Sequence, residues 1–176
     1  KGSRDQIDHV LVYADCGFGN LAQQAIANVD SIYSDGLPKT HVTLLGFGEQ
    51  SQVASEIRAI SRQDQSIFLP GRRFQSVTPF VASRHLKPKS SKYTLEHNLV
   101  DECHFRNLPP ARITSDPVRN QGRFRIARVG QGRKPPQSEG WFLTIEFEEA
   151  LKFDQLPLCL GYASHFGLGL FTGVDL

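Results

Sequence analysis

The sequence predicts an α+β fold in which amphipathic helices pack against an antiparallel sheet. The chain has 176 residues, of which 39% are hydrophobic, enough for one domain with a sizeable core. Two stretches, 20–36 and 92–108, place apolar residues at helical spacing. The stretch 140–151 alternates apolar and polar residues, as a strand with one buried face does.

The first part of the chain predicts two strands and two helices. Residues 6–14 are apolar and β-branched and predict a buried strand. The helix over 20–36 follows, with Asn20 as its N-cap. A second strand is predicted over 40–48 and a short helix over 49–61. The inward face of the first helix comprises Leu21, Ala25, Val29 and Ile32.

The rest of the chain predicts strands around one more helix. Strand material over 66–83, interrupted by proline, precedes the helix over 92–108. A short strand over 111–116, an alternating strand over 122–130 and the strand over 140–151 follow. The inward face of the helix comprises Leu95, Leu99, Cys103 and residues 105–108.

This order is that of a ferredoxin-like (RRM-like) βαββαβ antiparallel sheet, with additional C-terminal strands and a glycine-rich loop. Many RNA-binding domains use it because an open sheet offers a flat face to nucleotides. Acylphosphatase-like enzymes, metal chaperones and regulatory domains share it, so the fold alone does not decide the function. We interpret residues 1–176 as one such domain. Since the chain has no methionine, we expect a fragment of a longer protein, or a tag remnant in place of its natural start.

Cysteine usage and hydropathy exclude several classes of protein. The three cysteines have no CxxC spacing, which argues against a disulfide framework or a zinc site. Their low number favours a reducing, cytoplasmic environment. No apolar run approaches the length of a membrane-spanning helix, and no secretory leader is visible.

The net charge of +2 conceals a strong asymmetry along the chain. Residues 1–64 carry 5 basic and 8 acidic side chains, and residues 139–176 carry 1 basic and 6 acidic. Residues 65–138 carry 14 basic and 4 acidic side chains, a net charge of +10. This middle segment predicts binding of a polyanion such as nucleic acid. A solvated basic surface without a ligand is the alternative.

The C-terminal stretch LCLGYASHFGLGLFTG, residues 158–173, combines glycines with aromatic residues. Glycines allow backbone amides to approach a phosphate closely, and aromatic rings offer faces on which bases stack. A tight crossing at the end of a sheet, with the rings simply buried, is the alternative. The glycines are Gly161, Gly167, Gly169 and Gly173, and the rings are those of Tyr162, Phe166 and Phe171.

Two groups of cations accompany this tail. In the basic block, an imidazole that can move protons near neutral pH stands among cations that can stabilise a phosphate. This block comprises Arg84, His85, Lys87, Lys89 and Lys92. The second group could contact successive phosphates, or form a polar outer face. It comprises Arg123, Arg125, Arg128, Arg133 and Lys134. Among the other histidines, His9 lies in an apolar stretch typical of a core or edge position, and no metal-ligand set is evident.

Five stretches taken together resemble a known family. They are TPFVASRHLKPK, LPPARI, GRFRIAR, GWFLTIEFEEAL and LPLCLGYASHFGLGLF, in this order. They resemble the C-terminal half of a fused CRISPR subunit of type I-G (formerly I-U) systems. In that subunit, a backbone-type domain is joined to a CRISPR-RNA-processing endoribonuclease of the RAMP superfamily. The resemblance runs over most of the chain, and the tail and the basic block are its most specific parts.

The resemblance implies a ferredoxin-like fold, a glycine-rich loop that holds RNA, and cleavage of precursor CRISPR RNA without a metal or cofactor. In that chemistry the RNA 2′-hydroxyl attacks the adjacent phosphate and leaves a 2′,3′-cyclic phosphate. On this reading His85 and His165 form the proton-transfer pair, Arg84 and Lys87 contact the scissile phosphate, and His9 is held in reserve. The loop residues carried over are Gly161, His165, Gly167 and Gly169, and we add Tyr162 as an RNA contact.

The expected partners are precursor CRISPR RNA and other subunits of a type I surveillance complex, including an N-terminal fused domain. A catalytically inactive subunit that holds the end of the guide RNA is the alternative function, because its RNA contacts would be much the same. An unrelated ferredoxin-like domain with a coincidental basic face is a third possibility, which predicts no salt-dependent affinity for RNA hairpins.

Overall fold

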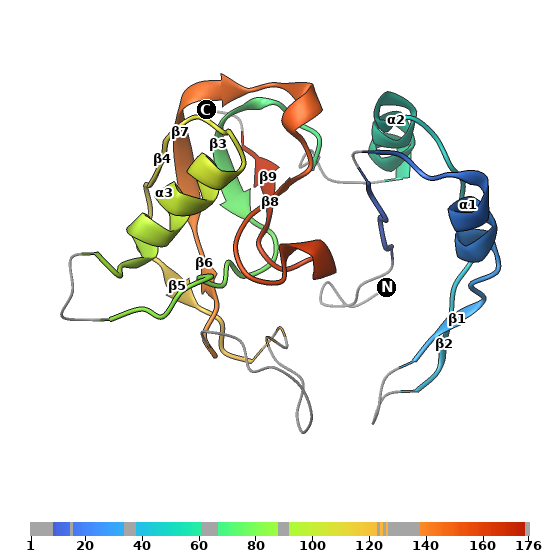
Figure 1. Cartoon of the computed structure of the whole chain (residues 1–176), viewed down its shortest axis with the longest axis horizontal. Helices are drawn as coiled ribbons and strands as arrows, with labels where there is room; N and C mark the ends of the chain where they lie inside the picture. Colours follow the sequence, from blue (N-terminus) through green and yellow to red (C-terminus); the bar gives the residue numbers. More distant parts are fainter. Residues whose placement is uncertain are drawn as a thin grey trace. The chain divides into compact units, whose positions relative to one another are not determined.

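A computed structural model describes residues 9–14, 16–33, 38–60, 67–87, 92–122, 124, 126 and 138–174. The chain divides into two compact units, residues 1–49 and 50–176, which are described separately (Figure 1). The described residues contain three α-helices, short 3₁₀ turns and antiparallel strands, so the predicted α+β class is confirmed. The interpretation of the chain as a single domain stays a prediction.

The described residues of the first unit form one helix and one strand pair. Helix α1 spans Asn20–Ala27, and strands β1 (Ser31–Ile32) and β2 (Thr40–His41) pair antiparallel. The predicted helix over 20–36 is therefore too long. Residues after Ala27 join the strand pair instead, which the hydrogen bond from Val42 N to Asp30 O (3.0 Å) extends. Asn20 is the first helical residue, and Gly19 is the N-cap.

The predicted strands of the first unit are wrong over most of their described length. Residues 9–14 form no strand, and of the strand predicted over 40–48 only 40–41 is present. A β-branched run becomes a strand only when it has a partner to pair with, which a local pattern does not supply. None of the described residues between 9 and 49 is fully buried, and most of their apolar side chains are exposed.

The second unit is built on a curled antiparallel sheet of five strands in the order β4-β7-β3-β9-β8 (Figure 1). Because β3 and β4 each pair antiparallel with β7, which lies between them, β3 and β4 run in the same direction. The strands are β3 (Gly71–Ser76), β4 (Ala111–Ile113), β7 (Thr144–Leu151), β8 (Leu158–Cys159) and β9 (Leu170–Gly173).

Helix α3 (Leu95–Phe105) connects β3 to β4 and covers one face of the sheet. Thr94 caps it by accepting a hydrogen bond from His97 N at 3.2 Å, as the N-cap preference for threonine predicts. Leu99 and Cys103 are buried in the core, as predicted. The prediction that Phe105 also faces inward is wrong, because Phe105 is the last residue of the helix and is 70% exposed.

The core confirms the alternation predicted for 140–151 only up to Phe147, since residues 148–150 are all exposed and the predicted strand is divided at Leu143. Ile145 and Phe147 on β7 are fully buried against Phe74 on β3. The rings of Phe74 and Phe147 meet edge to face, with centroids 5.7 Å apart, a favoured geometry for aromatic pairs. Helix α2 (Gln50–Ile60) was also predicted, and its Ala54 belongs to the same core.

Two further strands form a separate pair, β5 (Val118–Arg119) and β6 (Trp141–Phe142). The strand predicted over 122–130 is not present in its described residues, Gly122, Phe124 and Ile126. Two 3₁₀ turns complete the unit, Phe153–Gln155 before β8 and Ser164–Phe166 within the glycine-rich tail.

Candidate nucleic-acid interface

One extended segment, residues 78–84, connects the parts of the chain that the sequence assigns to RNA. We call it the hub segment. It follows β3 and ends at Arg84, the first residue of the basic block. Phe80 exchanges two backbone hydrogen bonds with Trp141, both 2.8 Å, so the hub segment lies beside β6. The tail is hydrogen-bonded to the hub segment, and Gly140, which follows the arginine-rich stretch (residues 123–134), packs against its Pro79.

The glycine-rich tail, residues 161–169, is hydrogen-bonded along the hub segment. Gly169 N donates to Pro79 O at 2.9 Å, and Tyr162 N donates to Val81 O at 2.8 Å. Thr78 Oγ1 donates to Gly167 O at 2.7 Å. The same hydroxyl accepts from the amide of the first β9 residue at 2.9 Å, so Thr78 holds the tail turn on both sides.

Two positions of the tail require glycine because other parts of the protein backbone lie too close for a side chain. Gly161 has φ of +89°, and a Cβ there would lie 2.5 Å from Val81 O. Gly169 has φ of +63°, and a Cβ there would collide with the carbonyl oxygen of Leu160. Gly167 also has a positive φ, +84°, but faces space with nothing within 4 Å of its Cβ position. The sequence suggested close approach to a phosphate; at Gly161 and Gly169 the close approach is to protein backbone.

The amides of the tail are mostly occupied. Those of Gly161, Gly167 and Gly169 donate to Glu102, to Ser164 O and to Pro79 O. Within the described part of the chain, the amides of Ala163 and His165 have no hydrogen-bond partner. A phosphate held by the backbone of this tail would therefore meet the amides of Ala163 and His165.

Helix α3 fixes the tail from the other side. Glu102 Oε2 accepts from Gly161 N at 3.1 Å and from Arg106 Nε at 3.3 Å. Arg106 Nη2 donates to Ser164 Oγ at 2.9 Å. The Glu102 carboxylate is 13% exposed and the Arg106 side chain 42% exposed, so the guanidinium reaches the surface beside the tail.

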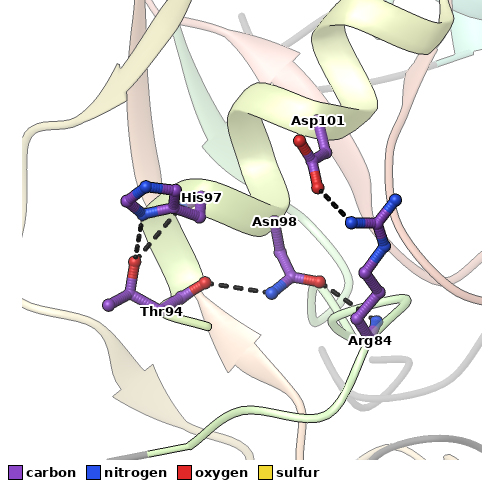
Figure 2. A network of polar contacts seen from close by, with 5 residues as sticks. All are labelled: Arg84, Thr94, His97, Asn98 and Asp101. Atoms are coloured by element: carbon purple, nitrogen blue, oxygen red, sulfur yellow. Dashed lines mark hydrogen bonds and ion pairs between the residues drawn. The ribbon is translucent and has the colours of Figure 1, made fainter. Parts of the chain in front are cut away.

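Figure 2 shows how α3 also holds the start of the basic block. The buried Asn98 accepts from Arg84 N at 3.1 Å and donates to Thr94 O at 3.0 Å. The Arg84 guanidinium forms an ion pair with Asp101 at 3.0 Å. Because both groups of this pair are about half exposed, the pair contributes little stability, but it orients Arg84.

The remaining described members of the basic block are exposed. The His85 imidazole is exposed to solvent. Lys87 N donates to Tyr93 O at 3.1 Å, and Lys87 Nζ lies 4.7 Å from the centroid of the Tyr93 ring, a cation–π contact. Lys92 is exposed as well, and Lys89 lies outside the described residues.

The arginine-rich stretch begins beside the hub segment. Asn120 Nδ2 donates to Phe124 O at 2.8 Å, and Asn120 N donates to Gly140 O at 2.8 Å. A Cβ on Gly140 would lie 2.9 Å from both Pro79 and Ile126, so Gly140 packs closely against the hub segment and against Ile126. Arg123, Arg125, Arg128, Arg133 and Lys134 themselves lie outside the described residues.

The aromatic residues of the tail differ in exposure. Phe171 is fully buried in the core, so the prediction that it offers a face to bases is wrong. Tyr162 is half-buried, and Phe166 is 82% exposed. The exposed His165 lies against Phe166, with ring centroids 4.2 Å apart.

His9, the reserve histidine, is exposed and belongs to the first unit, so it is described apart from these residues. Sequence pattern does not predict the part that four residues play in holding the tail, namely Thr78, Glu102, Arg106 and Ser164. The spacing of Glu102 and Arg106, four residues apart on a helix, is a signal for their ion pair but not for their contact with the tail.

The cysteines near this interface are not suited to nucleophilic chemistry. Burial raises the pKa of the Cys103 thiol to about 11, and the neighbouring Glu102 carboxylate adds to the rise. Burial also raises the pKa of Cys159. Both thiols therefore stay protonated near neutral pH.

Among the described residues, no three His, Cys, Asp or Glu side chains are grouped so that they could hold a metal ion. None of the helices in the described ranges is long and apolar enough to cross a membrane. Comparison of the chain with protein-family models, with curated proteins and with solved structures gives no match.

Proposed function

We propose that the chain binds precursor CRISPR RNA on the face around the hub segment and cleaves it there, as the C-terminal half of a type I-G CRISPR subunit. One observation carries this proposal. The tail and the basic block lie about 80 residues apart in the sequence, yet the tail is hydrogen-bonded to residues 78–81, which lead directly into the basic block at Arg84. Beside the arginine-rich stretch, Gly140 packs closely against Pro79 of the same segment.

The strand order supports the ferredoxin-like part of the proposal. The unit β3–α3–β4, with β7 between its two strands, is a split β-α-β unit, and β9 pairs on the other side of β3. The order β4-β7-β3-β9 is consistent with a ferredoxin-like plan, with β8 as an additional strand, but it does not use the predicted elements 6–14, 20–36 and 40–48. Between β7 and β9 the chain has two 3₁₀ turns in place of a second helix.

The proposed chemistry is attack of an RNA 2′-hydroxyl on the adjacent phosphorus. A bond forms between the 2′-oxygen and phosphorus, and the bond from phosphorus to the 5′-oxygen breaks. One imidazole takes the proton of the 2′-hydroxyl and the other protonates the departing 5′-oxygen. His85 and His165 are assigned these two steps because both rings are exposed on the segments that the hub joins.

The cations have defined places in this scheme. Arg84 is oriented by Asp101, and Lys87 is held over Tyr93; in the proposal both contact the scissile phosphate or its neighbour. Arg106 is added to them, because its guanidinium reaches Ser164 in the tail. Cations placed before the substrate binds stabilise the charge that develops in the transition state without a reorganisation cost.

The same contacts fit the alternative, an inactive subunit that holds the guide RNA. The His165 imidazole packs against Phe166, and Arg84 and Lys87 already have partners. These arrangements serve a binding surface as well as a catalytic one, so the two functions are separated by the experiment below.

The test is incubation of a labelled CRISPR repeat RNA with the protein in EDTA, followed by analysis of the fragment ends. We expect a 2′,3′-cyclic phosphate with wild type. Removal of one acid or base group should slow cleavage about 100-fold or more in His85→Ala and His165→Ala, with RNA binding retained. His104→Ala, which removes an exposed imidazole from α3, is the matched control and should cleave normally. Tight binding of RNA that stays intact would favour the guide-holding alternative, and no binding at moderate salt would refute both.

A further inference from the structure

The exposed Phe166 is the feature of the tail that the proposed chemistry does not use. Its side chain is 82% exposed, although burying a phenylalanine is strongly favourable in water. Single exposed apolar residues are common, so exposure alone does not indicate a role for Phe166. What distinguishes Phe166 is how its turn is held and what surrounds its ring.

The backbone under Phe166 is fixed. Phe166 N donates to Ala163 O at 2.9 Å, and Gly167 N donates to Ser164 O at 3.1 Å. Both ends of this turn are in the left-handed region, with φ of +59° at Ala163 and +84° at Gly167. The Thr78 hydroxyl then holds the carbonyl of Gly167. The backbone that carries the ring is therefore positioned before any ligand arrives, which limits the conformational entropy lost on binding.

The ring also has one supported side and one free side. The His165 imidazole packs beside it, with centroids 4.2 Å apart and planes tilted by 47°. With one side against His165 and 82% of the side chain still exposed, the opposite face is accessible.

The face of the sheet opposite the core, which we call the outer face, offers no such ring in the described strands β3, β4 and β7. The residues of β3 and β7 on this face alternate with the buried Phe74, Ile145 and Phe147, and they are polar. Arg112 and Arg73 lie opposite Glu146 there, and an ion pair of 2.9 Å joins Arg112 to Glu146. RRM-type domains stack bases on aromatic residues of this face. In this chain the described strands β3, β4 and β7 have no aromatic residue on it, so stacking requires a ring elsewhere.

The second unit has three exposed aromatic side chains among its described residues, Tyr93, Phe105 and Phe166. Lys87 covers one face of Tyr93. Phe105 lies at the end of α3, and its neighbouring imidazole, His104, is farther away, with centroids 6.3 Å apart. Phe166 alone among these three lies in the tail turn that carries the amides of Ala163 and His165 and the contact to Arg106.

From this arrangement we infer that Phe166 is a stacking platform for one unpaired nucleobase of the bound RNA. The inference rests on the proposed function, since it places a base next to the phosphate that the tail and Arg106 would hold. Phosphate contacts position an RNA, and an aromatic face then takes a base of any sequence. The Arg106 guanidinium, which donates to Ser164 in the same turn, favours a nucleotide over an apolar protein segment as the occupant.

The experiment measures binding of a labelled repeat hairpin with single-stranded adenosine flanks. The probe is made of 2′-O-methyl RNA, whose methylated 2′-oxygens cannot attack the adjacent phosphates, so the probe is not cleaved. We expect Phe166→Ala to weaken binding about 5- to 150-fold, as loss of one base–aromatic stack does. Phe166→Tyr and Phe166→Trp should bind like wild type, whereas Phe166→Leu, which keeps apolar volume without a ring, should bind like the alanine variant. Phe105→Ala, which also removes an exposed phenylalanine, is the matched control and should leave binding unchanged.

A second probe with abasic flanks tests stacking directly. Wild type should lose affinity for it, and Phe166→Ala should show no further loss, because the base and the ring act as one pair. The chain has one tryptophan, so Phe166→Trp also adds a fluorescence signal, which a stacked base should quench. Equal binding of wild type and Phe166→Ala to the first probe, at wild-type affinity, would refute stacking and leave the proposed function standing. A wild-type protein that binds neither probe at low salt would refute both.

Discussion

The contact between Glu102 and the tail gives a prediction that the structure makes quantitative. Glu102→Ala removes the acceptor of the Gly161 amide and the ionic partner of Arg106. A hydrogen bond to a charged group contributes about 1.5 to 3 kcal/mol, and a partly exposed ion pair adds about 0 to 1 kcal/mol. We therefore expect Glu102→Ala to lower the free energy of unfolding of residues 50–176 by about 1.5 to 4 kcal/mol. For a protein of this size, that lowers Tm by about 3 to 16 °C.

The conservative variant separates the two contributions. Glu102→Gln keeps a carbonyl oxygen for Gly161 N but loses the charge, so its cost should be about 1 kcal/mol. Glu149→Ala removes an exposed carboxylate from β7 and should stay within about 0.5 kcal/mol of wild type. The assay is urea unfolding followed by circular dichroism, with amide hydrogen exchange at Gly161 as a local readout. Wild-type stability of Glu102→Ala, or equal damage from glutamine and alanine, would refute the assigned contact.

Two further predictions follow from the same region. Gly169→Ala should fail to fold or lower the free energy of unfolding by more than about 3 kcal/mol, because a Cβ would collide with the Leu160 carbonyl. Gly167→Ala has nothing near its Cβ position. It should lower the free energy of unfolding by only about 1 to 2 kcal/mol, the cost of a left-handed backbone at alanine. Thermal melting of both variants compares them, and equal destabilisation would contradict the placement of these glycines. Because the pKa of Cys103 is raised by burial to about 11, from 9.0, the folded state favours the neutral thiol; its contribution to stability is present below pH 9 and is lost as the pH rises toward 11. Iodoacetamide at about pH 8, read by mass spectrometry, should label the exposed Cys16 and spare Cys103 until urea is added, and rapid labelling of Cys103 in the folded protein would contradict its burial.

Sequence pattern predicted the helices and strands in which the apolar pattern continues over many residues and only one face is buried. The strand over 144–151 and the helix over 95–105 repeat their apolar positions often enough to exclude other structures. In the first unit, short apolar runs such as 9–14 fit a strand only if a partner strand exists, and pattern does not report on partners. The helix end at Ala27 likewise depends on pairing between Ser31 and His41, which lies outside a local window.

For the candidate site, the sequence indicated residue types and left their neighbours undetermined. Tail glycines next to aromatic residues are consistent with a phosphate loop and with a tight backbone crossing, and these two readings have the same composition. The structure separates them position by position, because the acceptor of the Gly161 amide is Glu102, 59 residues away in the sequence. Contacts at such separations follow from the fold and have no local signature.

The burial of a replaced residue determines how a loss of RNA binding in its variant should be interpreted. His85, His165 and Phe166 are exposed, so their replacement should change RNA contacts and leave the free energy of unfolding almost unchanged. Asn98 and Glu102 are buried or nearly so, and each holds a segment that the proposal assigns to RNA. Their replacement should weaken RNA binding through displaced segments, with a matching loss of stability. A variant that loses RNA binding at full stability therefore identifies a contact residue, whereas parallel losses identify a residue that only positions one.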